Sequence, residues 1–115
     1  EHAIDYYFKA LESYRELEDD DKQLELLVGI GLNYRKLEQW EKAIECLEQA
    51  LAIAKYIEHR KEEIQIRVDL AEIFFKIEKR DLAISQIEEA EMDLKNIKAA
   101  WSTSLMRRIK SLRSF

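Results

Sequence analysis

The residues of this chain that could do chemistry are two histidines, one cysteine and a run of four acidic side chains. Metal sites need several His, Cys or carboxylate ligands at close spacing, and His2, His59 and Cys46 lie far apart in the sequence. We therefore expect no metal ion and no cofactor. No nucleophile, base and orienting group form a credible set, so we predict that the chain is not an enzyme.

The acidic run Glu18–Asp21 has the charge of a calcium loop but not its pattern. A calcium loop alternates its ligands, contains a glycine and closes with a glutamate at fixed spacing. Adjacent carboxylates repel one another, and aspartate is a favoured N-cap. The run therefore predicts a solvated turn that caps the next helix.

Gly29 and Gly31 could begin a dinucleotide-binding loop, but that loop needs a third glycine and must follow a strand. Tyr34 occupies the third position, and the surrounding segment has helical periodicity. We therefore expect no nucleotide site here. Gly31 is better explained as a point where two helices approach closely.

The apolar residues recur at three- and four-residue steps, which is the spacing of one helical face. The chain has no proline and only two glycines, which leaves few residues for hairpin turns in a sheet. Leu17 and Leu37 are the last members of the first two faces. The pattern predicts helices over about 2–18, 24–37, 40–57, 64–77, 83–97 and 99–114, with short turns at Glu38–Gln39 and Glu78–Lys79.

The same order of small and large residues recurs every 40 residues. Antiparallel helices pack closely only where one side chain is small. A glycine within a helix costs about 1 kcal/mol relative to alanine, so packing must compensate for Gly31. The aligned sets are Ala3, Ala43 and Ala83; Tyr7, Leu47 and Ile87; Ala10, Ala50 and Ala90; Gly31 and Ala71; Tyr34 and Phe74. This spacing predicts a helical-hairpin repeat.

These residues resemble the motif of the tetratricopeptide repeat (TPR) family over about residues 1–97. The closer match comprises Leu27, Ile30, Gly31, Tyr34, Trp40, Ala43, Leu47 and Ala50, and the looser one Leu70, Ala71, Phe74, Ala83, Ile87 and Ala90. Glu38 replaces the usual turn glycine, and the closing proline is missing, which accounts for the long repeat. The resemblance implies an all-α fold, a right-handed superhelix of antiparallel helix hairpins (a TPR-like α-solenoid) with about six helices.

The resemblance also implies a domain organisation. Residues 1–97 form TPR-like repeats, namely a half repeat over 1–20 and repeats over 24–57 and 64–97, and residues 98–115 form a capping or connector helix. The pattern is cut at both ends, which suggests a fragment of a larger protein. Tyr7 and Tyr14 would then be exposed, and we expect a possible homodimer through the truncated ends.

The family's groove lies on the first helix of each pair. Val28, Leu32 and Phe75 are not needed within a hairpin, so either peptide contact or contact with the last helix or an adjacent repeat explains them. The family's chaperone-binding members use a lysine and an asparagine one turn apart, which are missing here, so we predict no binding of acidic chaperone tails. The groove candidates are Glu25, Val28, Leu32, Arg35 and Lys36, and Gln65, Val68, Glu72, Phe75 and Lys76.

The net charge of −5 hides an uneven distribution, because the last stretch is basic and has no acid. Its cations are Lys98, Arg107, Arg108, Lys110 and Arg113. An acidic body with a basic end can dock on itself or on a neighbouring copy, and a self-docking cap or connector helix is favoured over nucleic acid, which we do not expect as partner. There is no long apolar run and no signal-like start, so we expect no membrane. The single cysteine fits a reducing compartment, and we predict a cytoplasmic location.

The resemblance implies a protein- or peptide-binding scaffold that uses a concave groove, and a protein or peptide partner whose identity the sequence does not give. Apolar anchors of the ligand would enter the groove, and basic residues would set its orientation. The alternative is a regulatory sensory module of a bacterial signalling enzyme, either a kinase or a nucleotide cyclase, or a peptide-pheromone receptor.

Overall fold

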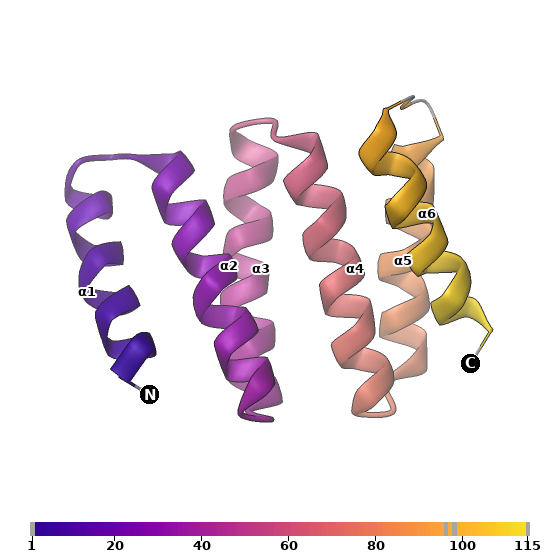
Figure 1. Ribbon diagram of the computed structural model, residues 1–115, viewed down its shortest axis with the longest axis horizontal. Coiled ribbons are helices and arrows are strands. Elements are labelled where there is room, and N and C mark those ends of the chain that lie inside the picture. The colour runs from indigo at the N-terminus through magenta and orange to yellow at the C-terminus, as the bar shows by residue number, and fades with distance from the viewer. Residues whose placement is uncertain (1, 96, 98, 115) are drawn as a thin grey trace. The chain divides into compact units, whose positions relative to one another are not determined.

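The computed structural model describes residues 2–95, 97 and 99–114, without the side chains of His2 and Ala3. Glu1, Lys98 and Phe115, which belong to the predicted domain ends and the basic stretch, lie outside the described residues. The described residues form six helices and no strand, which confirms the all-α prediction (Figure 1). The helices are α1 (His2–Glu16), α2 (Asp20–Lys36), α3 (Trp40–Tyr56), α4 (Arg60–Lys76), α5 (Arg80–Leu94) and α6 (Ala100–Arg113).

The starts of the last five helices are spaced by 20 residues, which is half the repeat seen in the sequence. The chain divides into two compact units. The first unit covers residues 1–59 and holds the α2–α3 hairpin with α1, and the second covers 60–115 and holds the α4–α5 hairpin with α6. Each unit thus contains one hairpin and one additional helix.

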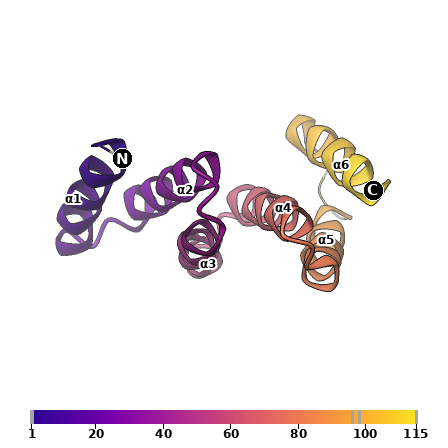
Figure 2. The same cartoon turned by 90° about the horizontal axis from the view of Figure 1, so that it is seen from below.

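In the first unit, α2 lies between α1 and α3 (Figure 2). The α2–α3 approach is closest at Gly31, where a Cβ atom would stand 2.9 Å from Cγ of Leu47. Asp19 caps α2 as predicted, because its carboxylate accepts a hydrogen bond of 3.1 Å from the backbone N–H of Lys22. The small residue Gly31 thus lies in the seam between α2 and α3, as the sequence predicted.

Two tyrosines of α1 depart from the sequence prediction. Tyr7 and Tyr14 were expected to be exposed, but both are half-buried. The Tyr7 ring lies over Gly29, with ring carbons 3.9 and 4.0 Å from the position that a Cβ atom would occupy there. Tyr6, one residue away, is 69% exposed. The prediction was wrong for both residues, and for Tyr7 the reason is that α2 covers its ring.

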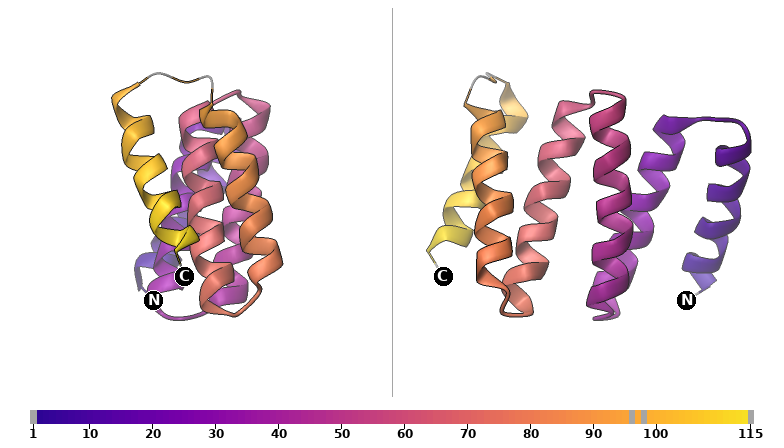
Figure 3. Two further views of the ribbon diagram at one scale, coloured as in Figure 1. Left: turned by 90° about the vertical axis from the view of Figure 1, so that its right-hand side faces the viewer. Right: turned by 180° about the vertical axis from the view of Figure 1, so that it is seen from behind.

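In the second unit, the α4–α5 hairpin repeats the seam with Ala71, Ala83 and Ile87 fully buried. Arg67 takes the place that Leu27 has in α2, and it too is buried. Its guanidinium donates a hydrogen bond of 3.0 Å to Oε1 of Gln86 on α5. The last helix, α6, lies alongside α4 and α5 (Figure 3).

The turns that follow α1 to α4 share one backbone conformation. Glu18, Glu38, Glu58 and Glu78 have φ angles of 55°, 59°, 58° and 61°, in the left-handed region that favours glycine. After α2, the N–H of Glu38 donates to the carbonyl of Arg35 and the N–H of Gln39 to that of Tyr34, at 3.0 and 2.9 Å. This is the Schellman pattern, which satisfies carbonyl groups at a helix end.

The left-handed turns also correct two predictions about the core. Leu17 and Leu37 were counted with the packing faces of their helices, but they are 73% and 44% exposed. The helices end at Glu16 and Lys36, so these leucines already lie in the turn and leave the face.

We expect Glu38→Gly to stabilise the chain by about 0.5–1 kcal/mol, because glycine removes the strain of a side chain at positive φ. The matched control is Glu48→Gly, the same substitution at an exposed position within α3, which should cost about 1 kcal/mol. Urea denaturation followed by circular dichroism gives both values. A loss of stability in Glu38→Gly would show that its left-handed turn carries no strain.

Candidate peptide-binding surfaces

The first candidate surface, which we call the α2 surface, consists of Glu25, Val28, Leu32, Arg35 and Lys36. Val28, Leu32 and Arg35 are half-buried, whereas Glu25 and Lys36 are exposed. The fully buried side of α2 carries Leu24, Leu27 and Ile30 instead. The α2 surface therefore presents two partly accessible aliphatic side chains one turn apart, with an arginine and a lysine at their C-terminal end.

The second candidate surface, the α4 surface, consists of Gln65, Val68, Glu72, Phe75 and Lys76. Val68 is fully buried, so it presents no surface to a ligand in this structure. The guanidinium carbon of Arg80 lies 6.0 Å from the ring centroid of Phe75, a cation–π distance. Gln65 is half-buried, and Lys76 alone of the five is exposed. The α4 surface is therefore less accessible than the α2 surface.

The helix α6 contributes to this difference, because it binds the α4 surface through Arg108. The guanidinium of Arg108 donates a hydrogen bond of 3.0 Å to Oδ1 of Asp69 and another to Glu72. Nearby, Nζ of Lys61 lies 5.9 Å from the ring centroid of Trp101. Contact with the last helix was one explanation for the apolar character of Val28, Leu32 and Phe75; the contact that the structure shows with α6 on the α4 surface is made by Glu72.

The environment of Arg108 explains how it holds α6 in place. Burial alone would lower the pKa of Arg108, but its hydrogen bond to Asp69 and the charges of Asp69 and Glu72 outweigh burial and raise the pKa. The side chains of the two acids are 14% and 24% exposed. Arg108, one cation of the basic end, is thus paired with acidic groups of the chain's own body.

The structure places the ten predicted groove residues on two helix faces, five on α2 and five on α4, each within its own unit. The sequence reasoning missed Asp69, which shares Arg108 with Glu72. It also missed a cleft between α5 and α6. Met92 and Met106 are out of phase with the buried faces of their helices, and this was the signal that could have revealed it.

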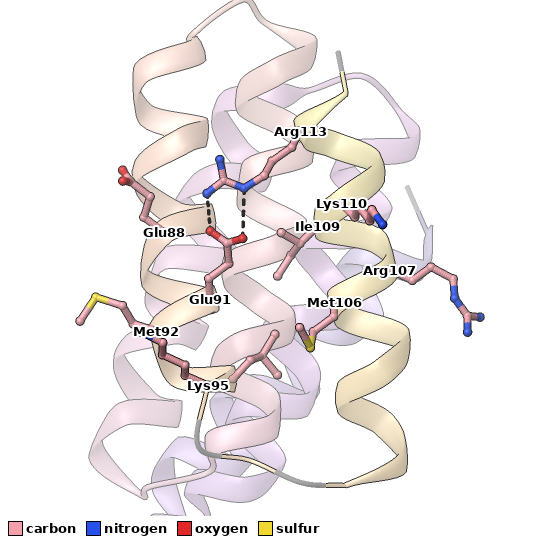
Figure 4. Close-up of a pocket in the computed structure, with 10 residues that line it drawn as sticks. Glu88, Glu91, Met92, Lys95, Met106, Arg107, Ile109, Lys110 and Arg113 are labelled. Atoms are coloured by element: carbon pink, nitrogen blue, oxygen red, sulfur yellow. Dashed lines mark hydrogen bonds and ion pairs between the residues drawn. The ribbon is translucent and has the colours of Figure 1, made fainter.

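This α5–α6 cleft has a volume of about 790 Å³ (Figure 4). Its floor is formed by Leu94 of α5 and Ile109 of α6, which are almost fully buried. Arg113 of α6 donates a hydrogen bond of 3.1 Å to Glu91 of α5 and so bridges the cleft at one end. The cleft also includes Glu88, Met92, Lys95, Met106, Arg107 and Lys110.

Other chemistry has little support in the part of the chain that the structure describes. No group of three or more His, Cys, Asp or Glu side chains there could hold a metal ion. Cys46 is buried, and burial together with the charge of Glu45 raises the pKa of its thiol, which disfavours the reactive thiolate. None of the described helices has the length and apolar character that crossing a membrane requires.

Comparison with known proteins supports the repeat. A family model described as tetratricopeptide repeat matches residues 1–55 and 23–91. The two matched stretches overlap in α2 and α3, the hairpin that carries the Gly31 seam. No curated protein matches the chain.

Proposed function

The chain belongs to the tetratricopeptide repeat family, and from this premise we propose that it is a protein-binding scaffold whose α2 surface receives a peptide or helix of a partner protein. TPR repeats generally mediate protein–protein interaction and are typically non-catalytic. The concave groove, its ligand and the assignment of repeats to residues 24–57 and 64–97 belong to this proposal.

The observation that carries the proposal is the pair Val28 and Leu32. They lie one turn apart on the side of α2 that does not carry its buried seam residues, and both keep part of their surface accessible. Such a pair suits the apolar anchors of an extended or helical peptide. Arg35 and Lys36 follow at the C-terminal end of α2, where they would favour a carboxylate of the ligand and fix its direction.

The α4 surface, which lies in the second unit, is a separate second candidate for peptide contact. Gln65, Phe75 and Lys76 would contact a ligand there, while Glu72 is held by Arg108 as long as α6 is docked. The α2 surface therefore supplies the main anchors, and its removal should have the larger effect on binding.

We expect Leu32→Glu to lower partner binding by about tenfold or more, because a charge would replace an apolar anchor in a desolvated contact. The measurement is a quantitative pull-down from source lysate, after circular dichroism shows an unchanged fold. Ala52→Glu is the matched control, since it adds the same charge at an exposed position of α3. Equal retention of the partner by both variants would exclude the α2 surface as the binding site.

A further inference from the structure

The α5–α6 cleft combines a buried apolar floor with exposed methionine side chains. Beside the buried floor of Leu94 and Ile109, the side chains of Met92 and Met106 are 68% and 58% exposed. Methionine is flexible and polarizable, so a surface that exposes it adapts well to apolar side chains of a partner. Figure 4 shows Met106 and Ile109 extending from α6 toward α5.

The side chains around the cleft carry more positive than negative charge. Its residues include four cations, Lys95, Arg107, Lys110 and Arg113, and two carboxylates, Glu88 and Glu91. Arg113 pairs with Glu91, whereas Lys95, Arg107 and Lys110 form no ion pair with any residue that the structure describes. Lys95 belongs to the α5 side and the other two to the α6 side. Uncompensated positive charge therefore stands on both sides of an apolar floor.

We propose that the α5–α6 cleft is a second docking site, for an acidic amphipathic helix of a partner protein. A ridge of apolar side chains on the partner helix would enter between Met92 and Met106, and carboxylates flanking that ridge would meet Lys95 on one side and Lys110 and Arg107 on the other. The two acids of the cleft would repel the continuous phosphates of a nucleic acid, which favours a peptide with separated carboxylates.

The dimensions of the cleft set the pattern of the ligand. From Glu88 to Lys95 the cleft follows about two turns of α5, or about 10 Å. That length accepts three apolar side chains of a helix, spaced as i, i+4 and i+7. The site is distinct from the α2 surface, which lies in the other unit of the chain, so each can be tested without the other.

The probe is a fluorescent synthetic helical peptide of about 15 residues, with leucine at the three anchor positions and glutamate on both flanks. A second peptide has lysine in place of every glutamate. In fluorescence anisotropy with the full chain, we expect the acidic peptide to bind about tenfold or more tightly than the basic one. Its Kd should rise several-fold between about 50 and about 300 mM NaCl, because salt screens the flanking charges.

Two variants on α6 locate the binding. Met106→Glu should weaken binding of the acidic peptide by about tenfold or more, because it places a charge in the apolar cleft. Ser104→Glu is the matched control, since it adds the same charge at an exposed position of the same helix that does not line the cleft, and it should bind as the wild type does. Both substituted positions are exposed, so both variants are expected to fold.

Three outcomes would overturn the proposal. One is equal binding of the acidic and basic peptides, and another is undiminished binding to Met106→Glu. The third is a dimer of the peptide-free chain, seen by sedimentation and abolished by Met106→Glu, which would assign the cleft to a second copy instead. Leu32→Glu should bind the probe as the wild type does. Loss of binding in that variant alone would show that the peptide binds to the α2 surface instead of the cleft.

Discussion

Replacing Gly31 with leucine is expected to destabilise the chain by about 3 kcal/mol or more, because the seam between α2 and α3 has no room for a side chain. A Cβ atom at this position would lie 2.9 Å from Cγ of Leu47 and 3.4 Å from the carbonyl oxygen of Ala43. Both neighbours are fully buried, so neither can move without disturbing the core. Urea denaturation of the wild type and of Gly31→Leu measures the difference in their free energies of unfolding.

A pair of alanine variants tests the same argument without the risk of an unfolded protein. Gly31→Ala should lose stability, since its methyl group meets Leu47, whereas Gly29→Ala meets only the Tyr7 ring at 3.9 Å. We expect Gly29→Ala to gain about 0.5–1 kcal/mol from the better helix propensity of alanine. If Gly31→Ala gained as much as Gly29→Ala, the close approach of α2 and α3 would be refuted.

The second large effect is expected for Arg108→Glu, which would place a third carboxylate beside Asp69 and Glu72. Loss of a fully buried ion pair costs about 3–5 kcal/mol, and because Arg108 is 40% exposed we expect about 2 kcal/mol here. The rate of hydrogen exchange of the α6 amides should rise together with this loss of stability. Arg107→Glu is the control, since Arg107 is exposed and the charge change is the same.

The pH dependence of this contact follows from the raised pKa of Arg108. A group with a raised folded-state pKa contributes its full stabilisation below its unfolded pKa and loses it only as the pH rises through the folded value. The unfolded pKa of arginine lies far above neutral pH, so this contribution is constant between about pH 6 and 9. Equal protection of α6 in Arg108→Glu and Arg107→Glu would exclude the ion pairs as what holds α6.

Much of the fold followed from the sequence, because the α2–α3 hairpin depends on local periodicity and on one small residue. Gly31 and the alanines at 40-residue spacing predicted which faces meet, and the structure buries Ala43, Ala50, Ala83 and Ala90. The helix ends were less predictable. Leu17 and Leu37 continue the apolar period, and only the left-handed residue after each of them reveals that the helix has already ended.

The environment of the α4 surface could not be read from the sequence in the same way. Glu72 has the position of a groove residue, but its contact with Arg108 depends on how α6 docks, and residues 36 positions apart in sequence make that contact. Buried Arg67 is a similar case, because an arginine at a core position is acceptable only if a partner such as Gln86 stands opposite. Tertiary pairing of this kind has no local signature.

The left-handed glutamates have a consequence for how such a chain can lengthen in evolution. Each of the four turns has three residues, with glutamate at its centre, so no turn has a residue to spare. A tandem duplication of the gene segment for residues 39–78 would join Glu78 to a second Gln39. That junction has the same sequence as the existing Glu38–Gln39 turn. Two helices, α3 and α4, could therefore be added without any new type of turn.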